Sequence, residues 1–401
     1  MPSPLSIYIH IPFCKALCSY CAFNTYIDLA HLMPAYARAI CAELAYVADG
    51  CPARPVHSIY FGGGTPSLLT LAQFAQILRQ LGASFALTDD CEISLEANPD
   101  DLSVSYLSEL RALGFNRISI GMQSANPRLL TLFERQHDLQ AVGDAVRSAR
   151  SARFDNVNLD VIFGSPYESL ADWQGTIGAA VDFAPEHISM YGLELKGGTS
   201  LRTQVDAGVL PQPDEDLFAD MYEYAAGFLA GHGYGQYEIS NWRLPARECR
   251  HNLQYWRNLD YIGIGAGAHG FANGMRYSTI TAPARYIAAL EKAPKQRRFP
   301  LTPAVAKHSA VSAADDLYET VMMSLRLTRE GISRAHFQAR FGADICDIFP
   351  APCQKMAGLG LLHIEAERVR LSDAGRLLSN AVIREFVEAI PPAAIPLLAA
   401  S

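Results

Sequence analysis

The stretch Leu5-Ser-Ile-Tyr-Ile-His-Ile-Pro-Phe-Cys-Lys-Ala-Leu-Cys-Ser-Tyr-Cys-Ala-Phe23 decides the fold that we expect. Its first part is an apolar run rich in isoleucine, which predicts a buried strand. Three cysteines, Cys14, Cys18 and Cys21, follow within eight residues, so a short loop can turn all three sulfurs toward one point. Thiolates are soft ligands that favour zinc or an iron–sulfur cluster. The stretch therefore predicts a metal site on a loop that follows the first strand.

The number of cysteines leaves the kind of metal site open. Closed zinc sites and most iron–sulfur clusters use four protein ligands, whereas this loop supplies three. Three thiolates would leave one iron of a four-iron cluster free to bind a small molecule. Alternatively, His10 or a distant cysteine could complete a structural zinc site. The cysteines could also be buried hydrophobic residues, which is the usual role of free cysteine.

Composition bounds the size and the partners of the protein. The chain has 401 residues, more than one hydrophobic core usually supports, so we expect a large domain and a smaller one. Half of the residues are hydrophobic, which is enough for a packed core. The formal net charge is −8, and phosphate binding needs a basic face, so we expect no nucleic-acid partner.

The nine cysteines and the amino terminus indicate the compartment. Nine cysteines in a chain of this length do not resemble a disulfide framework. The amino terminus has no basic segment, and His10 and Pro12 interrupt its apolar run, so we expect neither a signal peptide nor a membrane span. We therefore expect a cytoplasmic protein with free thiols.

Strand and helix patterns alternate along the first half of the chain. The expected strands are the run before the cysteines and residues 57–61, 92–96, 117–121, 157–163 and 187–191, with helices between them at 34–47, 71–81, 103–113, up to 152, and 170–183. Six strands that alternate with helices predict an α/β fold with a parallel sheet, either an open doubly wound sheet or a partial barrel.

The positions of polar residues favour the partial barrel. The cysteine loop follows the first strand, Gly62–Thr65 ends the second, Glu96 ends the third, Gln123 ends the fourth, and Asp160 interrupts the fifth. Barrel enzymes place their chemistry at the carboxyl ends of the strands. We therefore expect these features to share one site.

The last hundred residues have a different pattern. Helical stretches at 314–325, 333–341 and 356–360 lead to strands at 361–364 and 369–371 and a final helix at 373–387. Helices followed by a small hairpin resemble a winged-helix fold, but Glu365 and Glu367 at the turn speak against DNA binding. We expect domains at 1–300 and 301–401, the second a winged-helix-like α+β module that serves as a lid or docks a partner.

The C-x3-C-x2-C spacing with Tyr20 before the last cysteine resembles the signature of the radical S-adenosylmethionine (SAM) family. The stretch Gly62-Gly-Gly-Thr-Pro66 also matches that family's sequence at this point. The resemblance implies a six-unit partial barrel, a [4Fe-4S] cluster on the three cysteines, and SAM bound at the open iron. It further implies that Gly63, Gly64 and Thr65 hold the methionyl amine and that Tyr8 contacts SAM and the cluster.

Four polar residues extend the resemblance to oxygen-independent coproporphyrinogen oxidases. In these enzymes the positions that match Glu96, Gln123, Arg135 and Asp160 bind SAM, and the last three correspond to a second SAM site. A buried carboxylate is costly unless it is paired, which agrees with a ligand near Glu96 and Asp160. Alternatively, Arg135 pairs with an acidic neighbour, Glu134 or Asp138, on a helix surface.

A second motif resembles the haem-chaperone branch of the same family. His251, Asn252, Tyr255 and Trp256 form the sequence H-N-x-x-Y-W. Imidazole is a common axial ligand of haem iron, so the resemblance implies haem bound through His251. Two alternatives remain: His251 is a core histidine bonded to a backbone carbonyl, or Cys249 is the ligand instead.

Two functions compete. As a haem chaperone, the protein would pass haem to acceptor haem proteins, membrane-bound ones among them, and the cluster with SAM would license transfer or homodimer formation. As an oxygen-independent coproporphyrinogen III oxidase, it would cleave SAM and convert propionate side chains to vinyl groups in porphyrin biosynthesis. The oxidases carry a long extension before the first strand, whereas this chain begins seven residues before Tyr8, so we favour the chaperone.

Overall fold

The structure is a computed structural model that describes residues 4–291 and 298–389. Within these residues, one large sheet has the order β12-β11-β10-β9-β1-β2-β3-β4-β5-β6-β8-β7. Its strands are β1 (Leu5–Ile11), β2 (Val56–Gly63), β3 (Leu87–Ala97), β4 (Arg117–Gln123), β5 (Val157–Phe163), β6 (His187–Gly192), β7 (Gly235–Glu238), β8 (Asn241–Arg243), β9 (Tyr261–Ile264), β10 (His269–Ala272), β11 (Met275–Thr279) and β12 (Val305–Ala310). The run from β9 to β6 is parallel throughout, as the α/β prediction requires.

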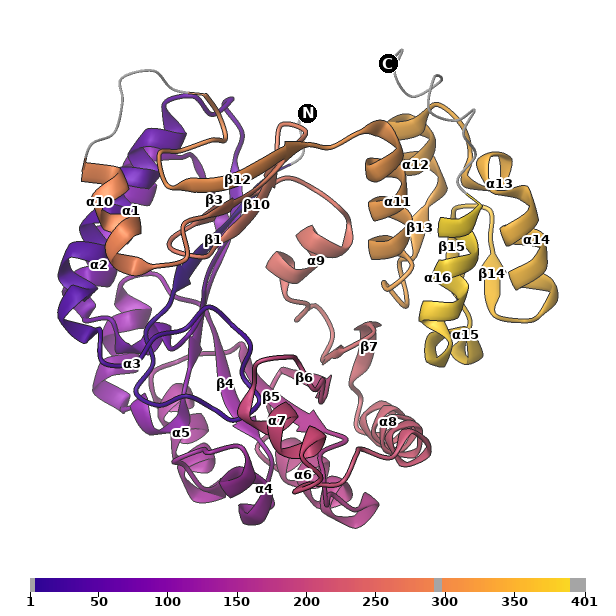
Figure 1. Ribbon diagram of the computed structural model, residues 1–401, viewed down its shortest axis with the longest axis horizontal. Helices are drawn as coiled ribbons and strands as arrows, with labels where there is room; N and C mark the ends of the chain where they lie inside the picture. Colours follow the sequence, from indigo (N-terminus) through magenta and orange to yellow (C-terminus); the bar gives the residue numbers. More distant parts are fainter. Residues whose placement is uncertain (1–3, 292–297, 390–401) are drawn as a thin grey trace.

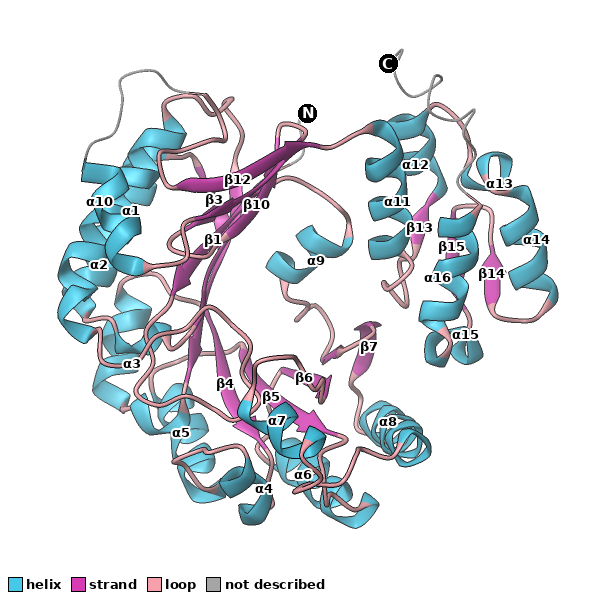
Figure 2. Cartoon of the chain, in the orientation of Figure 1, coloured by secondary structure: helices cyan, strands magenta, loops and turns pink. Residues whose placement is uncertain are grey.

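The helices of this part of the chain lie on both sides of the sheet. They are α1 (Met33–Ala48), α2 (Leu71–Ser84), α3 (Val104–Ala112), α4 (Pro127–Leu132), α5 (Leu139–Ser151), α6 (Leu170–Asp182), α7 (Ser200–Asp206), α8 (Glu215–Gly231), α9 (Arg250–Trp256) and α10 (Pro283–Glu291). Figures 1 and 2 show α1, α2, α3 and α5 along the outer side of the curved sheet and α9 on the opposite side. Side-chain caps fix where several helices begin, as at α2, where Thr70 and Gln73 form a capping box.

Alternation along each strand separates an apolar face from a polar one. Ile7 and Ile9 of β1, like Ile118 and Ile120 of β4, are fully buried in the core beneath the helices. The alternate positions are Ser6, Tyr8 and His10 in β1, Ser58, Tyr60 and Gly62 in β2, Glu92, Ser94 and Glu96 in β3, Arg117, Ser119 and Gly121 in β4, Asn158 and Asp160 in β5, and His187, Ser189 and Tyr191 in β6. The face of the sheet opposite α1, α2, α3 and α5 is therefore polar.

The strands beyond β1 and β6 were not expected from the sequence. β9 adds a parallel strand beside β1, and close backbone contact needs glycine there, because a Cβ at Gly263 would lie 1.9 Å from the carbonyl oxygen of His269. The buried carboxylate of Glu43 in α1 fixes the turn after β9 by accepting hydrogen bonds from the Gly265 N–H (3.0 Å) and the Tyr286 hydroxyl (2.5 Å).

A second core lies in the carboxyl-terminal module. It is built from α11 (Ala313–Ser324), α12 (Arg334–Phe341), α13 (Ile345–Ile348), α14 (Pro350–Gly358), α15 (Asp373–Leu377) and α16 (Ser379–Glu388), with a three-stranded sheet of order β13-β15-β14. The strands are β13 (Ile332–Ser333), β14 (Leu362–Ile364) and β15 (Arg368–Leu371). Figure 1 shows α9 between the large sheet and this module, with α11 nearest to α9.

Two sequence predictions for this module need correction. The single helix expected at 373–387 is divided into α15 and α16 at Leu378. The helix expected at 356–360 is the end of α14, which begins earlier because Pro350 suits the first turn of a helix. The domain boundary at 300/301 stays a prediction; β12 still pairs with β11, and residues 390–401 lie outside the described part.

Candidate functional site

Most of the residues singled out in the sequence line one cavity of about 690 Å³, which we call the outer cavity. Its walls include Cys14, Cys18, Tyr20, Cys21, Gly63, Gly64, Thr65, Glu96, Gln123, Arg135 and Asp160. Pockets of roughly 300–1,000 Å³ are typical of small-molecule sites. The shared site expected from the strand ends is therefore present as a cavity of suitable size.

The cysteine loop forms one wall of the outer cavity. Cys14, Cys18 and Cys21 are all free thiols and partly exposed to it. The Thr65 hydroxyl donates to the sulfur of Cys14 (3.5 Å), and the Arg135 guanidinium donates to the sulfur of Cys18 (3.4 Å). Burial raises the pKa of Cys14 and Cys21, so without a metal both are neutral thiols at pH 7. Donors aimed at sulfur fit thiolates that carry negative charge when they bind a metal.

The glycine stretch after β2 lies directly against the cysteine loop. Gly63 has φ +114°, a conformation that L side chains rarely adopt. A Cβ at Gly64 would lie 2.7 Å from the carbonyl oxygen of Phe13 and 3.1 Å from the sulfur of Cys14. The Thr65 N–H donates to the same Phe13 carbonyl (2.8 Å). The glycines therefore let two backbone segments meet where a ligand of the cysteine loop would lie.

The structure tests the fit of a metal at this loop. Among the residues that the structure describes, no three His, Cys, Asp or Glu side chains lie close enough to form a preassembled metal site. His10 does not serve as a fourth ligand, because Nδ1 accepts from the Tyr8 hydroxyl (2.9 Å) and Nε2 donates to the Asn24 carbonyl (2.9 Å). Three soft donors on one loop, facing one cavity, fit a cluster that would gather them on binding.

Glu96 and Asp160 face both cavities as buried carboxylates with hydrogen-bond donors around them. Glu96 accepts from the Tyr60 hydroxyl (2.9 Å) and from the Gly63 N–H (3.0 Å). Burial, with a smaller effect of repulsion from Asp160, raises the pKa of Glu96 to about 7. Asp160 accepts from Ser119 (2.8 Å), and burial raises its pKa as well. These two carboxylates can accept hydrogen bonds from ligand hydroxyls or amines.

Gln123 is turned into the outer cavity by a local backbone feature, and Arg135 is held there by hydrogen bonds. Gln123 has φ +64°, next to a register shift in β4 between Gly121 and Gln123, and such bulges redirect side chains. Arg135 donates to the Asn98 side chain (2.8 Å) and to the Gly121 carbonyl (3.2 Å). The alternative in which Arg135 pairs with a neighbouring acid on a helix surface is therefore wrong.

Tyr8 and His251 lie apart from the cysteines, in a smaller cavity of about 170 Å³ that we call the inner cavity. His251 is only 1% exposed. Its Nδ1 contacts the Ser58 hydroxyl (3.1 Å) and its Nε2 contacts the Tyr255 hydroxyl (2.8 Å). Burial lowers the pKa of His251 to about 3, so the ring is neutral. In this conformation neither ring nitrogen is open to haem iron, and the cavity is too small for the macrocycle.

The motif helix α9 is held in place by Glu92 of β3. Glu92 accepts hydrogen bonds from the backbone N–H groups of Arg250 (3.0 Å) and His251 (3.2 Å) and from the Cys249 thiol (3.6 Å). Cys249 is fully buried, and burial raises its pKa to about 12, so it is a neutral thiol. Cys249 is thus as inaccessible to haem in this conformation as His251.

Sequence reasoning missed two polar residues at these cavities. Asn98 lines the outer cavity and accepts from Arg135. Arg117 lines the inner cavity and is almost completely buried. The signal was available for Arg117, because it occupies the polar face of β4 two residues before Ser119.

A separate observation concerns membranes. In the part of the chain that the structure describes, every helix is too short or too polar to cross a lipid bilayer.

The chain is similar to known proteins over nearly its whole length. The family model of the radical SAM superfamily matches residues 8–180, and that of the HemN C-terminal domain matches residues 311–378. The chain is 37% identical to the haem chaperone HemW of Mycobacterium tuberculosis, over 96% of this chain and 95% of the relative. It is 33% identical to HemW of Bacillus subtilis (95% and 99%) and 32% identical to HemW of Escherichia coli (96% and 98%).

The fold also matches a solved structure. The coproporphyrinogen III oxidase HemN of Escherichia coli, described as a radical SAM enzyme, aligns with a TM-score of 0.80 and 23% identity, over 98% of this chain and 91% of that one. This similarity shows a common fold, whereas the sequence relatives match at higher identity over nearly their full length. The chain therefore belongs to the HemW family of radical SAM proteins.

Proposed function

We propose that the protein is a haem chaperone, which binds haem and passes it to acceptor haem proteins, membrane-bound ones included. The observation that carries this proposal is the similarity, over nearly the whole chain, to proteins named haem chaperones. The fold shared with the oxidase HemN supports the radical SAM architecture but does not favour oxidase activity.

The outer cavity is proposed to hold a [4Fe-4S] cluster and SAM. Cys14, Cys18 and Cys21 would supply the thiolates, with Arg135 and Thr65 donating hydrogen bonds to the sulfurs. When bound, the cluster supplies an electron that can cleave the sulfonium of SAM. Gly63, Gly64 and Thr65, which line the outer cavity beside the cysteine loop, would hold the methionyl amine.

The remaining polar residues are proposed to position SAM. Glu96 would accept from its amine or ribose, and Gln123, Arg135 and Asp160 would contact a second molecule of SAM. Tyr20, which packs edge-on against Phe133, would shape the wall beside the cluster. Tyr8 would act from the inner cavity, where its hydroxyl orients His10.

Haem is proposed to bind at α9 after a rearrangement. His251 remains the predicted axial ligand, and its ring becomes available once Tyr255 and Ser58 release the two nitrogens.

The proposal extends to the barrel type of the large sheet and to the fold type of the carboxyl-terminal module. We infer that β1 to β6 with their helices form the six-unit partial barrel of radical SAM proteins, and that the carboxyl-terminal module is a winged helix from residue 301 onward. A lid or docking role for this module and a homodimer in the functional cycle follow as predictions.

One pair of anaerobic assays tests the proposed function. Reconstituted protein is loaded with haem and mixed with an apo haem protein, and the absorbance of the acceptor is followed. We expect the acceptor to gain haem faster than from free haem in solution. In parallel, the reconstituted protein is incubated with coproporphyrinogen III and SAM. Formation of vinyl product, or failure to bind haem, would overturn the chaperone proposal.

A further inference from the structure

The side chain of Arg117 is buried on the polar face of β4, and no acidic side chain among the described residues forms an ion pair with its guanidinium. Arg117 is 2% exposed, and its Nε is a buried donor without a partner. Within the described residues the structure gives its side chain neither a hydrogen bond nor an ion pair. A buried charge without a partner costs several kcal/mol, so such groups are normally paired or face a ligand. The donors of Arg117 therefore have no acceptor in the described part of the chain.

The acidic residues on the same face of the neighbouring strands, Glu92 and Glu96 of β3 and Asp160 of β5, form their hydrogen bonds with other groups. Glu92 uses both carboxylate oxygens to accept from the backbone N–H groups of Arg250 and His251 at the start of α9. Burial lowers the pKa of Arg117, but nearby negative groups, Glu92 among them, more than offset this effect, so the pKa lies above its usual value. The guanidinium is thus always charged, but its donors remain free.

The inner cavity offers space beside these donors. Three of the four tyrosines on its walls have hydroxyl partners, since the hydroxyls of Tyr8, Tyr60 and Tyr255 contact His10, Glu96 and His251. The amide of Asn252, which lines the same cavity, has no hydrogen-bond partner in the described part of the chain. Arg117 and Asn252 are therefore two polar groups with free donors, one on β4 and one on α9.

The inner cavity adjoins the outer one. Glu96, Ser119, Asp160 and Tyr191 line both cavities, so an arm of a ligand in the outer cavity can extend between them. The two acids do not exclude an anionic arm, because Glu96 is covered by donors from Tyr60 and Gly63, and Asp160 by donors from Ser119 and Asn158. With about 170 Å³, the inner cavity admits a short arm but not a macrocycle.

We propose that the inner cavity is a carboxylate-binding subsite in which Arg117 and Asn252 hold the carboxylate arm of a ligand. A planar guanidinium matches a carboxylate with two parallel hydrogen bonds, and the amide of Asn252 adds a third donor from α9. Because α9 carries His251, an anion in this subsite would join the sheet to the motif helix. Two ligands of the proposed function carry such an arm: haem has propionates, and the second molecule of SAM has a methionyl carboxylate.

A test with propionate depends on neither haem nor SAM, so it is independent of the proposed function. The melting temperature of the purified protein is measured with increasing propionate and with propionamide, its neutral analogue. A ligand that binds the folded state raises the melting temperature, and we expect a rise of about 2 °C at saturation. We expect propionamide to have no effect. Equal effects of the two compounds, or no effect of propionate, would overturn the subsite.

Matched variants assign the effect to Arg117. Arg117→Gln should abolish the rise with propionate, whereas Arg128→Gln, the same change on the exposed surface of α4, should preserve it. Without ligand, Arg117→Met should melt at the same temperature as the unchanged protein or higher, because it removes an unpaired buried charge. A strong loss of stability in Arg117→Met would mean that Arg117 is a structural residue. Asn252→Ala, at a less buried position, should weaken the response to propionate severalfold.

A second comparison identifies the carrier of the arm. Affinities for haem and for haem dimethyl ester, and for SAM and decarboxylated SAM, are measured with the unchanged protein and with Arg117→Gln. A preference of about tenfold for one carboxylate form, lost in the variant, identifies that ligand as the carrier. If Arg117→Gln preferred the carboxylate forms of haem and of SAM as strongly as the unchanged protein does, the proposal that a ligand arm reaches Arg117 would be overturned.

Discussion

At the scale of single residues, the thiols of the cysteine loop can be tested one at a time. Cys18 accepts a hydrogen bond from Arg135 and lies between the other two thiols in sequence. Cys18→Ser should abolish the iron–sulfur absorbance of reconstituted protein and with it SAM cleavage, because a hydroxyl is a poor ligand for iron. Cys41→Ser, on α1 and outside the loop, is the control and should retain both. Unchanged iron content in Cys18→Ser would rule out the cluster.

The haem ligand is a separate prediction for residue 251. His251→Ala should weaken haem binding and shift the Soret band, because imidazole would no longer bind the iron. The measurement is a haem titration followed by absorbance, with Cys249→Ser beside it. An unaffected Soret band in His251→Ala, together with a shifted one in Cys249→Ser, would assign the ligand to the thiolate instead.

The raised pKa of Glu96 predicts that the free energy of unfolding depends on pH. Its pKa is about 7 in the folded protein, compared with 4.5 for a free glutamate side chain. Between these values the folded state binds more protons than the unfolded state, so the stability contribution of Glu96 is lost as pH rises from about 4.5 to 7. The loss amounts to at most about 3 kcal/mol.

Replacing Glu96 by glutamine should remove that part of the pH dependence. Urea unfolding at pH 5 and pH 8 measures it: the variant should gain stability relative to the unchanged protein between the two pH values. Burial also raises the pKa of Glu168 and of Glu238 to about 7, so the comparison uses the difference between the two proteins rather than either slope alone. Identical slopes would contradict the assignment. Glu223→Gln, on the exposed side of α8, should have no effect.

At the scale of elements, one buried carboxylate joins α1, the turn after β9, and α10. Glu43 accepts from the Gly265 N–H, the Tyr286 hydroxyl and the Thr302 hydroxyl (2.6 Å). Glu43→Ala would leave three buried donors without an acceptor, and each orphaned donor costs about 1–3 kcal/mol. We expect a loss of at least about 3 kcal/mol in the free energy of unfolding, measured in urea. Glu223→Ala should change it by less than about 0.5 kcal/mol. If Glu43→Ala lowered the free energy of unfolding by less than about 0.5 kcal/mol, water would be accepting the three hydrogen bonds in place of the carboxylate.

The elements also show which parts of the fold can be predicted from sequence. β5 has the bounds 157–163 that its apolar pattern predicted, and α6 differs from its predicted range by one residue. Alternation and helical periodicity are local, so they can be recognised within one segment. β9 was not predicted, because its position beside β1 depends on glycines at 263 and 265 that permit close backbone contact and carry no periodic pattern.

In the candidate site, too, the features that depend on local sequence could be predicted, and those that depend on distant contacts could not. The cysteines and the glycine stretch are adjacent in sequence to the strands that present them, and the structure places them on one cavity. The burial of His251 could not be predicted, since it depends on Glu92, 159 positions earlier in the chain. The orientation of Gln123 likewise results from a bulge in β4, which the sequence does not mark.

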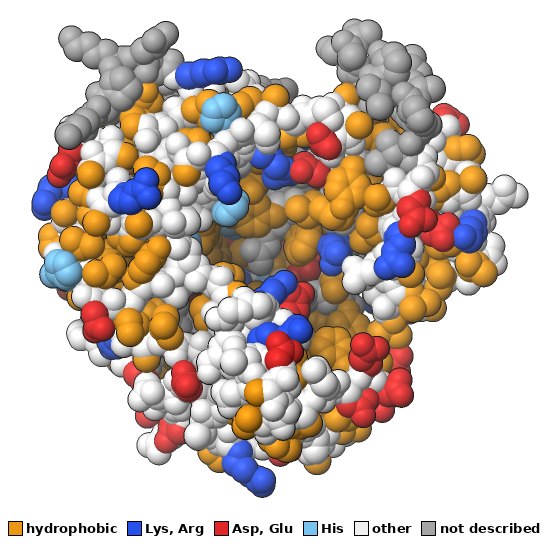
Figure 3. Space-filling view, in the orientation of Figure 1, with side chains coloured by type: hydrophobic (Ala, Val, Ile, Leu, Met, Phe, Trp, Pro, Cys, Tyr) orange, Lys and Arg blue, Asp and Glu red, His pale blue; other side chains and the backbone are white. Residues whose placement is uncertain are grey.

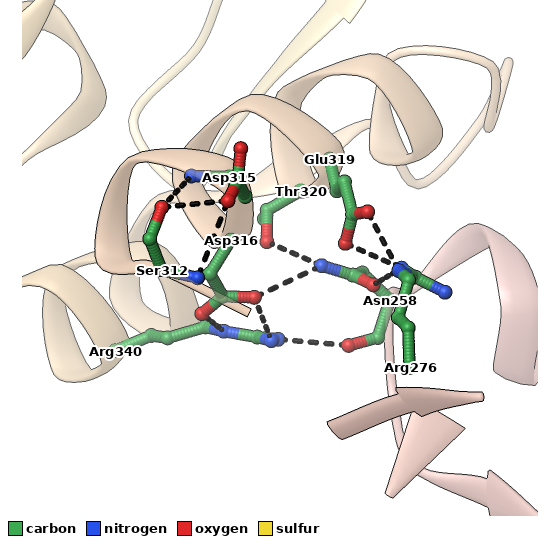
Figure 4. Close-up of polar contacts among 8 residues, drawn as sticks. All are labelled: Asn258, Arg276, Ser312, Asp315, Asp316, Glu319, Thr320 and Arg340. Atoms are coloured by element: carbon green, nitrogen blue, oxygen red, sulfur yellow. Dashed lines mark hydrogen bonds and ion pairs between the residues drawn. The ribbon is translucent and has the colours of Figure 1, made fainter. Parts of the chain in front are cut away.

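At the scale of the whole molecule, polar contacts join the carboxyl-terminal module to the large sheet. Figure 4 shows Arg276 of β11 facing Glu319 of α11, and Asn258 between Asp316 and Thr320. Arg276 forms two hydrogen bonds with the Glu319 carboxylate, one of them 2.6 Å long, and Asn258 donates to Asp316 (3.1 Å) and Thr320 (3.0 Å). Figure 3 shows the molecule hollowed between these two parts on this face. Polar interfaces of this kind permit relative motion more readily than apolar ones.

Because α11 packs beside α9, loosening this interface should also loosen the helix that carries His251. Arg276→Ala and Glu319→Ala should each increase hydrogen exchange of the α9 amides by about tenfold, which corresponds to about 1.4 kcal/mol for a bidentate, partly buried pair. The double variant should exchange no faster than either single one, because both changes remove the same contact. Arg202→Ala, which breaks an exposed ion pair on α7, should leave α9 unchanged. Effects that simply add in the double variant would show that the two residues act independently, and exchange that is unaffected in all variants would show that α9 is held by the sheet alone.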